Sequence, residues 1–331
     1  MLSTLEILLP VFGLIFAGFA CRRRGLLGPT AASELNRFVV WLALPALLFD
    51  TMAHATWHQL YQPAFVATFA LACAVVYVLV LAVRLLSGRH LADASVDAIA
   101  ASYPNTGYIG FPLCLIAFGP ASLTPTTIAT ILVACVLFAI AIVMIEVGLQ
   151  AERAPHRLAL KVLGSLARNP LIVSPVVGVV VAGVHVTLPQ SAETFLKLLS
   201  GAASPCALVS LGLFLAEKRG SATTGSAAAA AAADPATASP PNATVSWLLT
   251  GTKLLLQPAL TWWLAARVFA LPTELVQIAV VLAALPTGTG PFMLAEFYRR
   301  EAHITSRTIL LSTLGSLVTL SLLLLYIRHG S

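Results

Sequence analysis

Two short strings rich in Pro, Gly, Asn and Thr interrupt long apolar stretches. One is Pro104-Asn105-Thr106-Gly107-Tyr108, and the other is Pro286-Thr287-Gly288-Thr289-Gly290. Pro removes a backbone donor and clashes with the preceding helical turn, and Gly permits backbone angles that other residues avoid. Each string therefore predicts a break inside a membrane-length helix. Broken backbone within a bilayer is tolerated where it is buried in protein or lines a wet cavity, and paired breaks indicate a transport site.

The two breaks supply the chemistry of an anion site. A helix that starts at mid-membrane leaves backbone N–H groups unpaired and carries about half a positive elementary charge. We expect such starts near Gly107 and Thr289, and two of them facing one cavity would bind an anion. Asn105, Thr106, Thr287 and Thr289 would add neutral donors and acceptors at the crossing.

The opposite ends of the broken helices have the complementary character. The halves ending near Tyr103 and Leu285 present carbonyls, so Na⁺ and H⁺ are candidate coupling ions, and no other cofactor is expected. However, no acidic residue falls within 98–145 or 275–295. A cation exchanger of crossed-helix type would be expected to keep carboxylates there. Their absence favours an anionic substrate.

The composition places these strings in an integral membrane protein. Hydrophobic residues make up 59% of the 331 residues and charged residues 10%, whereas soluble domains average about 45–50% and about 25%. With roughly 20 residues per span, the pattern predicts an all-α protein with ten transmembrane helices. The predicted spans are 4–21, 34–53, 63–87, 94–118, 124–150, 169–187, 192–216, 246–270, 273–298 and 304–327.

Basic residues set the orientation of these spans. Most of the 19 Lys and Arg lie in the odd-numbered loops, which the positive-inside rule makes cytoplasmic. We therefore expect a multi-pass protein of the cytoplasmic membrane with both termini outside. The net charge of +6 is then a topology signal, and a nucleic-acid partner is not expected. The five cysteines show neither Cys-x-x-Cys spacing nor a His pairing, so we expect packing roles and no metal site.

An internal repeat relates the two breaks. Pro10-Val11-Phe12-Gly13, followed by Ala17-Gly18, recurs as Pro175-Val176-Val177-Gly178, followed by Ala182-Gly183. The chain is predicted to consist of residues 1–150 (helices 1–5) and 151–331 (helices 6–10). Since five is odd, the second repeat enters the membrane from the opposite side. An Ala- and Pro-rich segment, 217–245, is predicted to be a mobile cytoplasmic linker.

Residues 105–112 resemble the Asn-Thr-Gly-[Phe/Tyr]-x-Gly-x-Pro signature of the auxin efflux carrier family, and 284–287 resemble that family's second broken helix. The resemblance covers the whole chain and implies a fold related to bile acid–sodium symporters. It implies a scaffold of helices 1, 2, 6 and 7 and a core of helices 3–5 and 8–10. It also implies transport of organic anions such as malonate or auxin-like acids, by a rocking or elevator motion in a homodimer. One departure is that the family often has Asn near the position of Gly288 or Thr289.

Five further residues are weaker candidates for the cavity or for ion coupling. Pro45 and Pro205 would line the cavity or simply pack, because small residues let helices approach closely. Asp50 and Glu296 are acids near the hydrocarbon, where ionisable residues are functional by default, but both lie near predicted helix ends. Lys253 could attract a substrate carboxylate, although snorkelling to the membrane surface is the favoured interpretation.

These observations favour a carrier of small organic anions that binds its substrate at the crossing and works by alternating access. The carrier would be driven by an ion gradient, or by the substrate gradient and the membrane potential. An ion-coupled carrier of another substrate class and a transporter-like membrane sensor remain alternatives. An enzyme is not expected, because the sequence contains no cluster of nucleophile, base or metal ligands.

Overall fold

The structure is a computed structural model that describes residues 4–54, 61–149, 164, 167, 170–184, 188–220 and 243–329. Every one of the ten predicted spans coincides with a helical stretch in these residues. The number of spans that cross a membrane and the inverted repeat stay predictions. Most of the linker predicted at 217–245 lies outside the described residues.

The helices in chain order are α1 (Thr4–Arg23), α2 (Ala31–Phe38), α3 (Leu44–Ala53), α5 (Pro63–Leu86), α6 (Leu91–Ser102), α7 (Phe111–Phe118), α8 (Leu123–Ile131), α9 (Phe138–Leu149), α11 (Pro170–Val184), α12 (Gln190–Gly220), α14 (Ala243–Gly251), α15 (Gln257–Trp263), α16 (Thr273–Ala284), α17 (Gly290–Phe297) and α18 (Ala302–His329). A 3₁₀ turn, η3 (Pro120–Ser122), precedes α8. Among the described residues, five continuous stretches are long and apolar enough to cross a membrane. They are Ala31–Ala53, Pro63–Leu86, Pro120–Leu149, Gln190–Ala216 and Ala302–Arg328.

Wide π-helical turns join several of these helices into longer rods. They are η1 (Val39–Ala43), η2 (Thr106–Gly110), η4 (Leu132–Leu137), η5 (Thr252–Leu256) and η6 (Leu264–Val268). Three of them have a visible cause: Pro45 follows η1, Pro112 follows η2, and Pro258 follows η5. Pro cannot donate to the carbonyl four residues earlier and its ring crowds that carbonyl, so the preceding turn widens.

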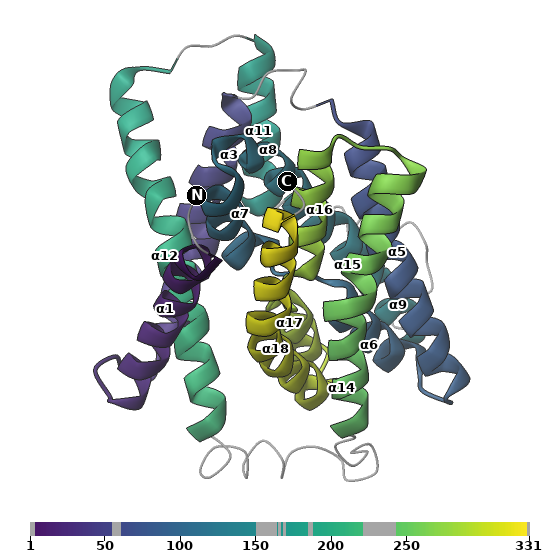
Figure 1. Ribbon diagram of the computed structural model, residues 1–331. Helices are drawn as coiled ribbons and strands as arrows, with labels where there is room; N and C mark the ends of the chain where they lie inside the picture. The colour runs from purple at the N-terminus through teal and green to yellow at the C-terminus, as the bar shows by residue number, and fades with distance from the viewer. Residues whose placement is uncertain are drawn as a thin grey trace.

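The helices gather into two groups. In the first, which we call the scaffold bundle, α1 packs on α12, α11 packs on α3, and α12 also packs on α2 and α3. The second group, the crossing bundle, contains α5 to α9 and α14 to α18. Figure 1 shows α1 and α12 on one side of the molecule and α14, α15 and α5 on the other. The scaffold and core that the family resemblance implies stay a prediction.

Glycine contacts hold the scaffold bundle together. A Cβ added to Gly18 would lie 2.2 Å from the Val209 carbonyl oxygen, and one on Gly212 would lie 1.9 Å from that of Ile15. The backbones of α1 and α12 therefore touch directly, as small residues allow in membrane helices. Both glycines were absent from the predicted site, and their role is packing.

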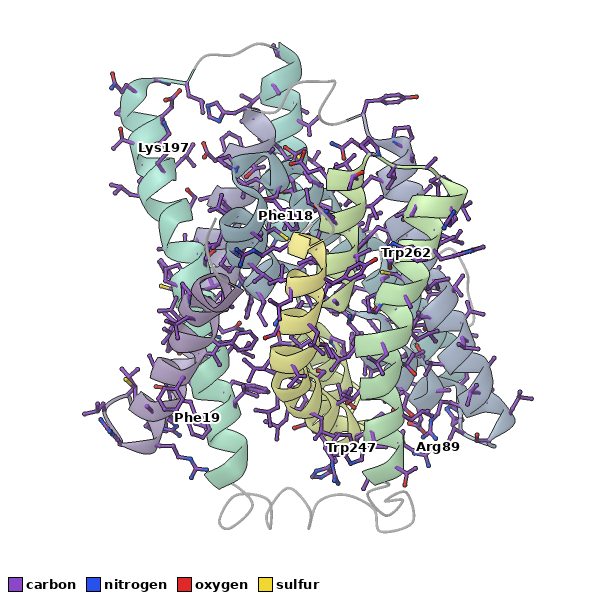
Figure 2. All side chains as sticks on the ribbon, in the orientation of Figure 1. Phe19, Arg89, Phe118, Lys197, Trp247 and Trp262 are labelled. Atoms are coloured by element: carbon purple, nitrogen blue, oxygen red, sulfur yellow. The ribbon has the colours of Figure 1, made fainter. Side chains whose placement is uncertain are left out.

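Ion pairs tie the crossing bundle together near one end of the molecule. Arg84 Nε on α5 donates to Asp97 Oδ2 on α6 over 2.7 Å, and both side chains are buried. Arg300, just after α17, pairs with Asp93 on α6 over 2.8 Å. In Figure 2 the labelled Arg89 and Trp247 lie toward this lower end, and Lys197 lies at the opposite end. These contacts link α5, α6 and the α17–α18 connection into one unit.

Candidate functional site

Both predicted helix breaks are present, and they meet. α6 ends at Ser102 and helical structure resumes at Thr106, while α16 ends at Ala284 and α17 begins at Gly290. The backbones of Pro104 and Thr287 pair as one antiparallel β-bridge. The Asn105 N–H donates to the Pro286 carbonyl over 2.8 Å, and the Gly288 N–H donates to the Tyr103 carbonyl over 3.0 Å. The two unwound segments therefore satisfy each other's backbone where water is scarce.

Thr287 completes the pairing through its side chain. Its hydroxyl donates to the Ala100 carbonyl over 2.9 Å, in the last turn of α6. Its own N–H donates to the Ser312 hydroxyl on α18 over 3.1 Å. Thr287 is fully buried. The Thr287 hydroxyl thus caps the carbonyl end of α6, the first half of the other broken helix.

Two side chains from one helix cap the remaining carbonyl ends. Lys253 Nζ on η5 donates to the Ala283 carbonyl over 2.6 Å, at the end of α16. Gln257 Nε2, one turn further, donates to the Ser102 carbonyl over 3.1 Å, at the end of α6. Both side chains are 0% exposed. The prediction that Lys253 snorkels to the surface is therefore wrong: the lysine faces the bundle interior, where the carbonyl end of α16 attracts a cation.

Donors, in contrast, are left over at the helix starts. Asn105 Oδ1 accepts from the Tyr108 N–H over 3.3 Å and so caps the second half of the first broken helix. Asn105 Nδ2 is buried and has no acceptor among the described residues. Gly107 and Gly290 lie in the first turns of η2 and α17, where the N–H groups of a helix have no acceptor within that helix. Buried donors normally find partners, so this excess of donors points to a negatively charged or acceptor-rich ligand.

The crossing opens toward the scaffold bundle. Gly107 and Thr289 are half-buried, while most of their neighbours in the two strings are buried. A Cβ on Gly107 would meet only a methyl group of Leu44 on α3, at 3.8 Å. The Tyr108 hydroxyl donates to Asn36 Oδ1 on α2 and also interacts with Thr289. The two helix starts therefore face the seam between the bundles.

The seam has an apolar lining from both bundles. Tyr108 and Phe111 of the crossing bundle pack with scaffold residues on α3, η1 and α12, which include Leu44, Ala203 and Ala207. Phe214 on α12 also lies edge-on to Phe292 on α17, with ring centroids 5.5 Å apart. The contacts at this seam are mainly between apolar side chains, which can slide more readily than a hydrogen-bonded interface.

The weaker candidates fall into different places. Pro45 is buried on α3, next to Leu44 in the chain, and Pro205 is exposed on α12. Asp50 lies near the end of α3, with Oδ1 3.2 Å from His54 Nδ1, and His54 in turn approaches Glu193 at 3.9 Å. This group belongs to the scaffold bundle, away from the crossing. Glu296 belongs to α17, and its side chain lies outside the described part.

Two residues at the site were not anticipated: Gln257 and Ser312. Gln257 and Ser312 are polar residues inside predicted spans, and polar groups there face a protein neighbour that can bond them. That signal was available in the sequence, but it does not say which carbonyl each residue reaches. Within the described residues, no group of three His, Cys, Asp or Glu could hold a metal ion.

The comparisons with known proteins agree with this geometry. The sequence model of the family described as Membrane transport protein matches residues 3–324. The chain is 31% identical over 326 residues to the "Putative malonate transporter" of Rhizobium meliloti (strain 1021), covering 98% of this chain and 96% of that protein. It is 23% identical to the "Uncharacterized transporter YfdV" of Escherichia coli (strain K12), over 94% of each chain. It is also 29% identical to Auxin efflux carrier component 3 of Arabidopsis thaliana, over 49% of this chain and 22% of that protein.

Proposed function

Because the chain belongs to the membrane transport protein family, which includes the auxin efflux carriers, we propose that it carries small organic anions across the cytoplasmic membrane. The substrate class is that of short carboxylates such as malonate. This class follows from the crossing of the two broken helices and from the similarity to a protein named as a malonate transporter.

The observation that carries the proposal is the unpaired Nδ2 of Asn105. This group is buried without an acceptor among the described residues, and it lies at the crossing of two helix starts, whose first N–H groups have no acceptor within their own helices. A carboxylate oxygen would accept from Nδ2, and the two helix starts would stabilise its negative charge. Hydrogen bonds to an ionised acceptor are roughly twice as strong as neutral ones. The pairing of Pro104 with Thr287 holds the donors together as one unit.

Alternating access would use the seam between the two bundles. The ion pairs and the β-bridge join the helices of the crossing bundle into one body. Where this body meets the scaffold bundle, Tyr108 and Phe111 make apolar contacts. Movement along this seam would expose Gly107 and Thr289 to one side of the membrane and then to the other. This motion is the one expected for a carrier with a site fixed at the crossing.

The proposal is tested by uptake of radiolabelled malonate, malate, acetate and an indole-type acid into proteoliposomes. Asn105→Asp is the decisive variant, because its carboxylate can still accept from the Tyr108 N–H but replaces the free donor with negative charge. We expect an anion carrier to lose at least about tenfold in uptake. Asn105→Ala would lose both the cap and the donor.

A matched control is Thr261→Ala. Thr261 is a buried polar residue of the same bundle whose hydroxyl donates within its own helix to the Gln257 carbonyl over 2.8 Å. This variant is expected to keep wild-type uptake. Saturable uptake of no anion in the panel, or undiminished uptake by Asn105→Asp, would contradict the proposal.

A further inference from the structure

The carbonyl ends of the two broken helices are places where carriers of this architecture hold a coupling cation. Each end carries about half a negative elementary charge from unpaired carbonyls. A sodium ion would need several oxygen ligands there that are not already engaged. The fit of Na⁺ therefore depends on which groups already bond these carbonyls.

In this protein, side chains occupy both ends. Lys253 Nζ lies 2.6 Å from the Ala283 oxygen at the end of α16, and Gln257 Nε2 lies 3.1 Å from the Ser102 oxygen at the end of α6. The first distance is that of a short, charge-assisted hydrogen bond. The Thr287 hydroxyl donates to the Ala100 carbonyl oxygen. The two backbone hydrogen bonds of the β-bridge are accepted by the carbonyl oxygens of Tyr103 and Pro286. The oxygens of Ala100, Ser102, Tyr103, Ala283 and Pro286 thus each accept a hydrogen bond, whereas Gln257 Oε1 is buried without a partner among the described residues.

The surroundings of Lys253 also disfavour an added cation. The side chain is 0% exposed, and it forms no ion pair with a carboxylate in the described part of the chain. The thiol of Cys73 is a neighbour, and it accepts from Gln257 Nε2 over 3.3 Å. A second cation beside protonated Lys253 would be repelled, and the repulsion is strong where the dielectric constant is low. Lys253 and Gln257 therefore compete with Na⁺ for the carbonyl oxygens at the two helix ends.

We infer that Lys253 is the resident cation of the crossing, and that it sets the charge preference of the substrate site while Gln257 holds the neighbouring helix end in register. Lys253 bonds Ala283, and three residues later Pro286 accepts from the backbone of Asn105. The ammonium thus lies behind the donors that face the substrate. It attracts anions without contacting them, so it is a positioning residue. The inference rests on the proposed anion site for its second part only.

The first test needs no substrate and no variant. Thermal unfolding of the purified protein is measured in sodium, potassium and choline chloride at equal ionic strength. A resident ammonium predicts the same Tm in all three salts. A Tm that rises with Na⁺ concentration alone would mean that Na⁺ binds the folded state, and would overturn the inference. This result is independent of whether malonate is the substrate.

The second test asks whether Lys253 sets the charge preference. Lys253→Met removes the ammonium and keeps an unbranched side chain, and Gln257→Met is the matched control on the same face. Uptake of a dicarboxylate and a monocarboxylate is compared by apparent KM. We expect Lys253→Met to raise the KM for the dicarboxylate by about tenfold more than that for the monocarboxylate, and Gln257→Met to leave the ratio unchanged. Equal losses for both anions in Lys253→Met would assign the lysine a structural role only. If Lys253→Met does not fold, the salt comparison on the wild-type protein still decides the first part.

Discussion

The ring of Tyr103 lies directly against the backbone of Gly288. A Cβ added to Gly288 would come 2.9 Å from ring atoms Cδ1 and Cε1, and one on Gly290 would come 2.8 Å from Cζ. The ring is also held from behind by Phe138, with centroids 6.3 Å apart in an edge-on arrangement. Gly288 and Gly290 therefore make room for one aromatic side chain. Tyr103 and the glycine pair form a single packing unit.

Gly288→Ala is expected to destabilise the protein by about 1–3 kcal/mol, because the added methyl group overpacks the contact with Tyr103. Thermal unfolding in detergent measures the loss. Gly251→Ala is the control: nothing lies within 4 Å of its added Cβ, and Ala is the better helix former by about 1 kcal/mol. Tyr103→Ala in the Gly288→Ala background should recover part of the loss. An unchanged Tm for Gly288→Ala would contradict the packing unit.

Thr289→Asn is expected to fold and to change selectivity among anions. Thr289 is half-buried at the seam, so a slightly larger amide has room there, whereas Gly288→Asn should not fold. The amide adds a donor beside Asn105, and a hydrogen bond to a charged group contributes about 1.5–3 kcal/mol. Competition of unlabelled anions against labelled substrate measures the change. Identical competition profiles for wild type and Thr289→Asn would place the site elsewhere.

Arg84→Met is expected to destabilise the protein strongly, by about 3–5 kcal/mol, because it leaves the Asp97 carboxylate buried without its partner. Asp97 is 0% exposed, and its Oδ1 already lacks a partner among the described residues. The control is Arg37→Met, which removes an exposed pair with Glu34 and should cost at most about 1 kcal/mol. Thermal unfolding of both variants measures the loss of stability. Similar losses in Arg84→Met and Arg37→Met would show that the buried pair stabilises the protein no more than the exposed pair does.

Tyr108→Phe is expected to change the rate of transport more than the apparent affinity. The hydroxyl of Tyr108 bonds Asn36 across the seam, so its loss alters the balance between positions of the two bundles. Tyr77→Phe is the matched control, because Tyr77 bonds Ser95 over 2.6 Å within the crossing bundle. Initial rates over a range of substrate concentrations separate the maximal rate from KM. An effect on KM alone would assign Tyr108 to substrate binding.

The helix breaks could be predicted from the sequence because their cause is local. Pro104 and Pro286 stand in strings with Gly, Asn and Thr, and this combination breaks the helix, whereas Pro205 alone lies inside the continuous helix α12. The direction in which the second half-helices cross the membrane stays a prediction. The family was predicted correctly for the same reason, since its signature is a short string at the first break.

The partners of the carbonyl ends could not be predicted in the same way. Lys253 and Gln257 lie far along the chain from Ser102, and their reach depends on the wide π turn before Pro258. The sequence favours snorkelling of Lys253, because a lysine can usually reach the membrane surface. The position of the Lys253 side chain depends on which face of its helix is turned inward, and the packing of the whole bundle decides that. The contact of Tyr103 with the two glycines is tertiary for the same reason.

The β-bridge between Pro104 and Thr287 also dictates an order of assembly. Its two strands belong to opposite halves of the chain, and each leaves backbone groups unpaired until the other arrives. During synthesis, the backbone groups near Pro104 therefore stay unpaired inside the membrane until the second half of the chain is made, and such unpaired polar groups are costly there. Closure of the bridge would be among the last steps of folding, so a chain that stops short of helix α16 should be recognised and degraded rather than stored.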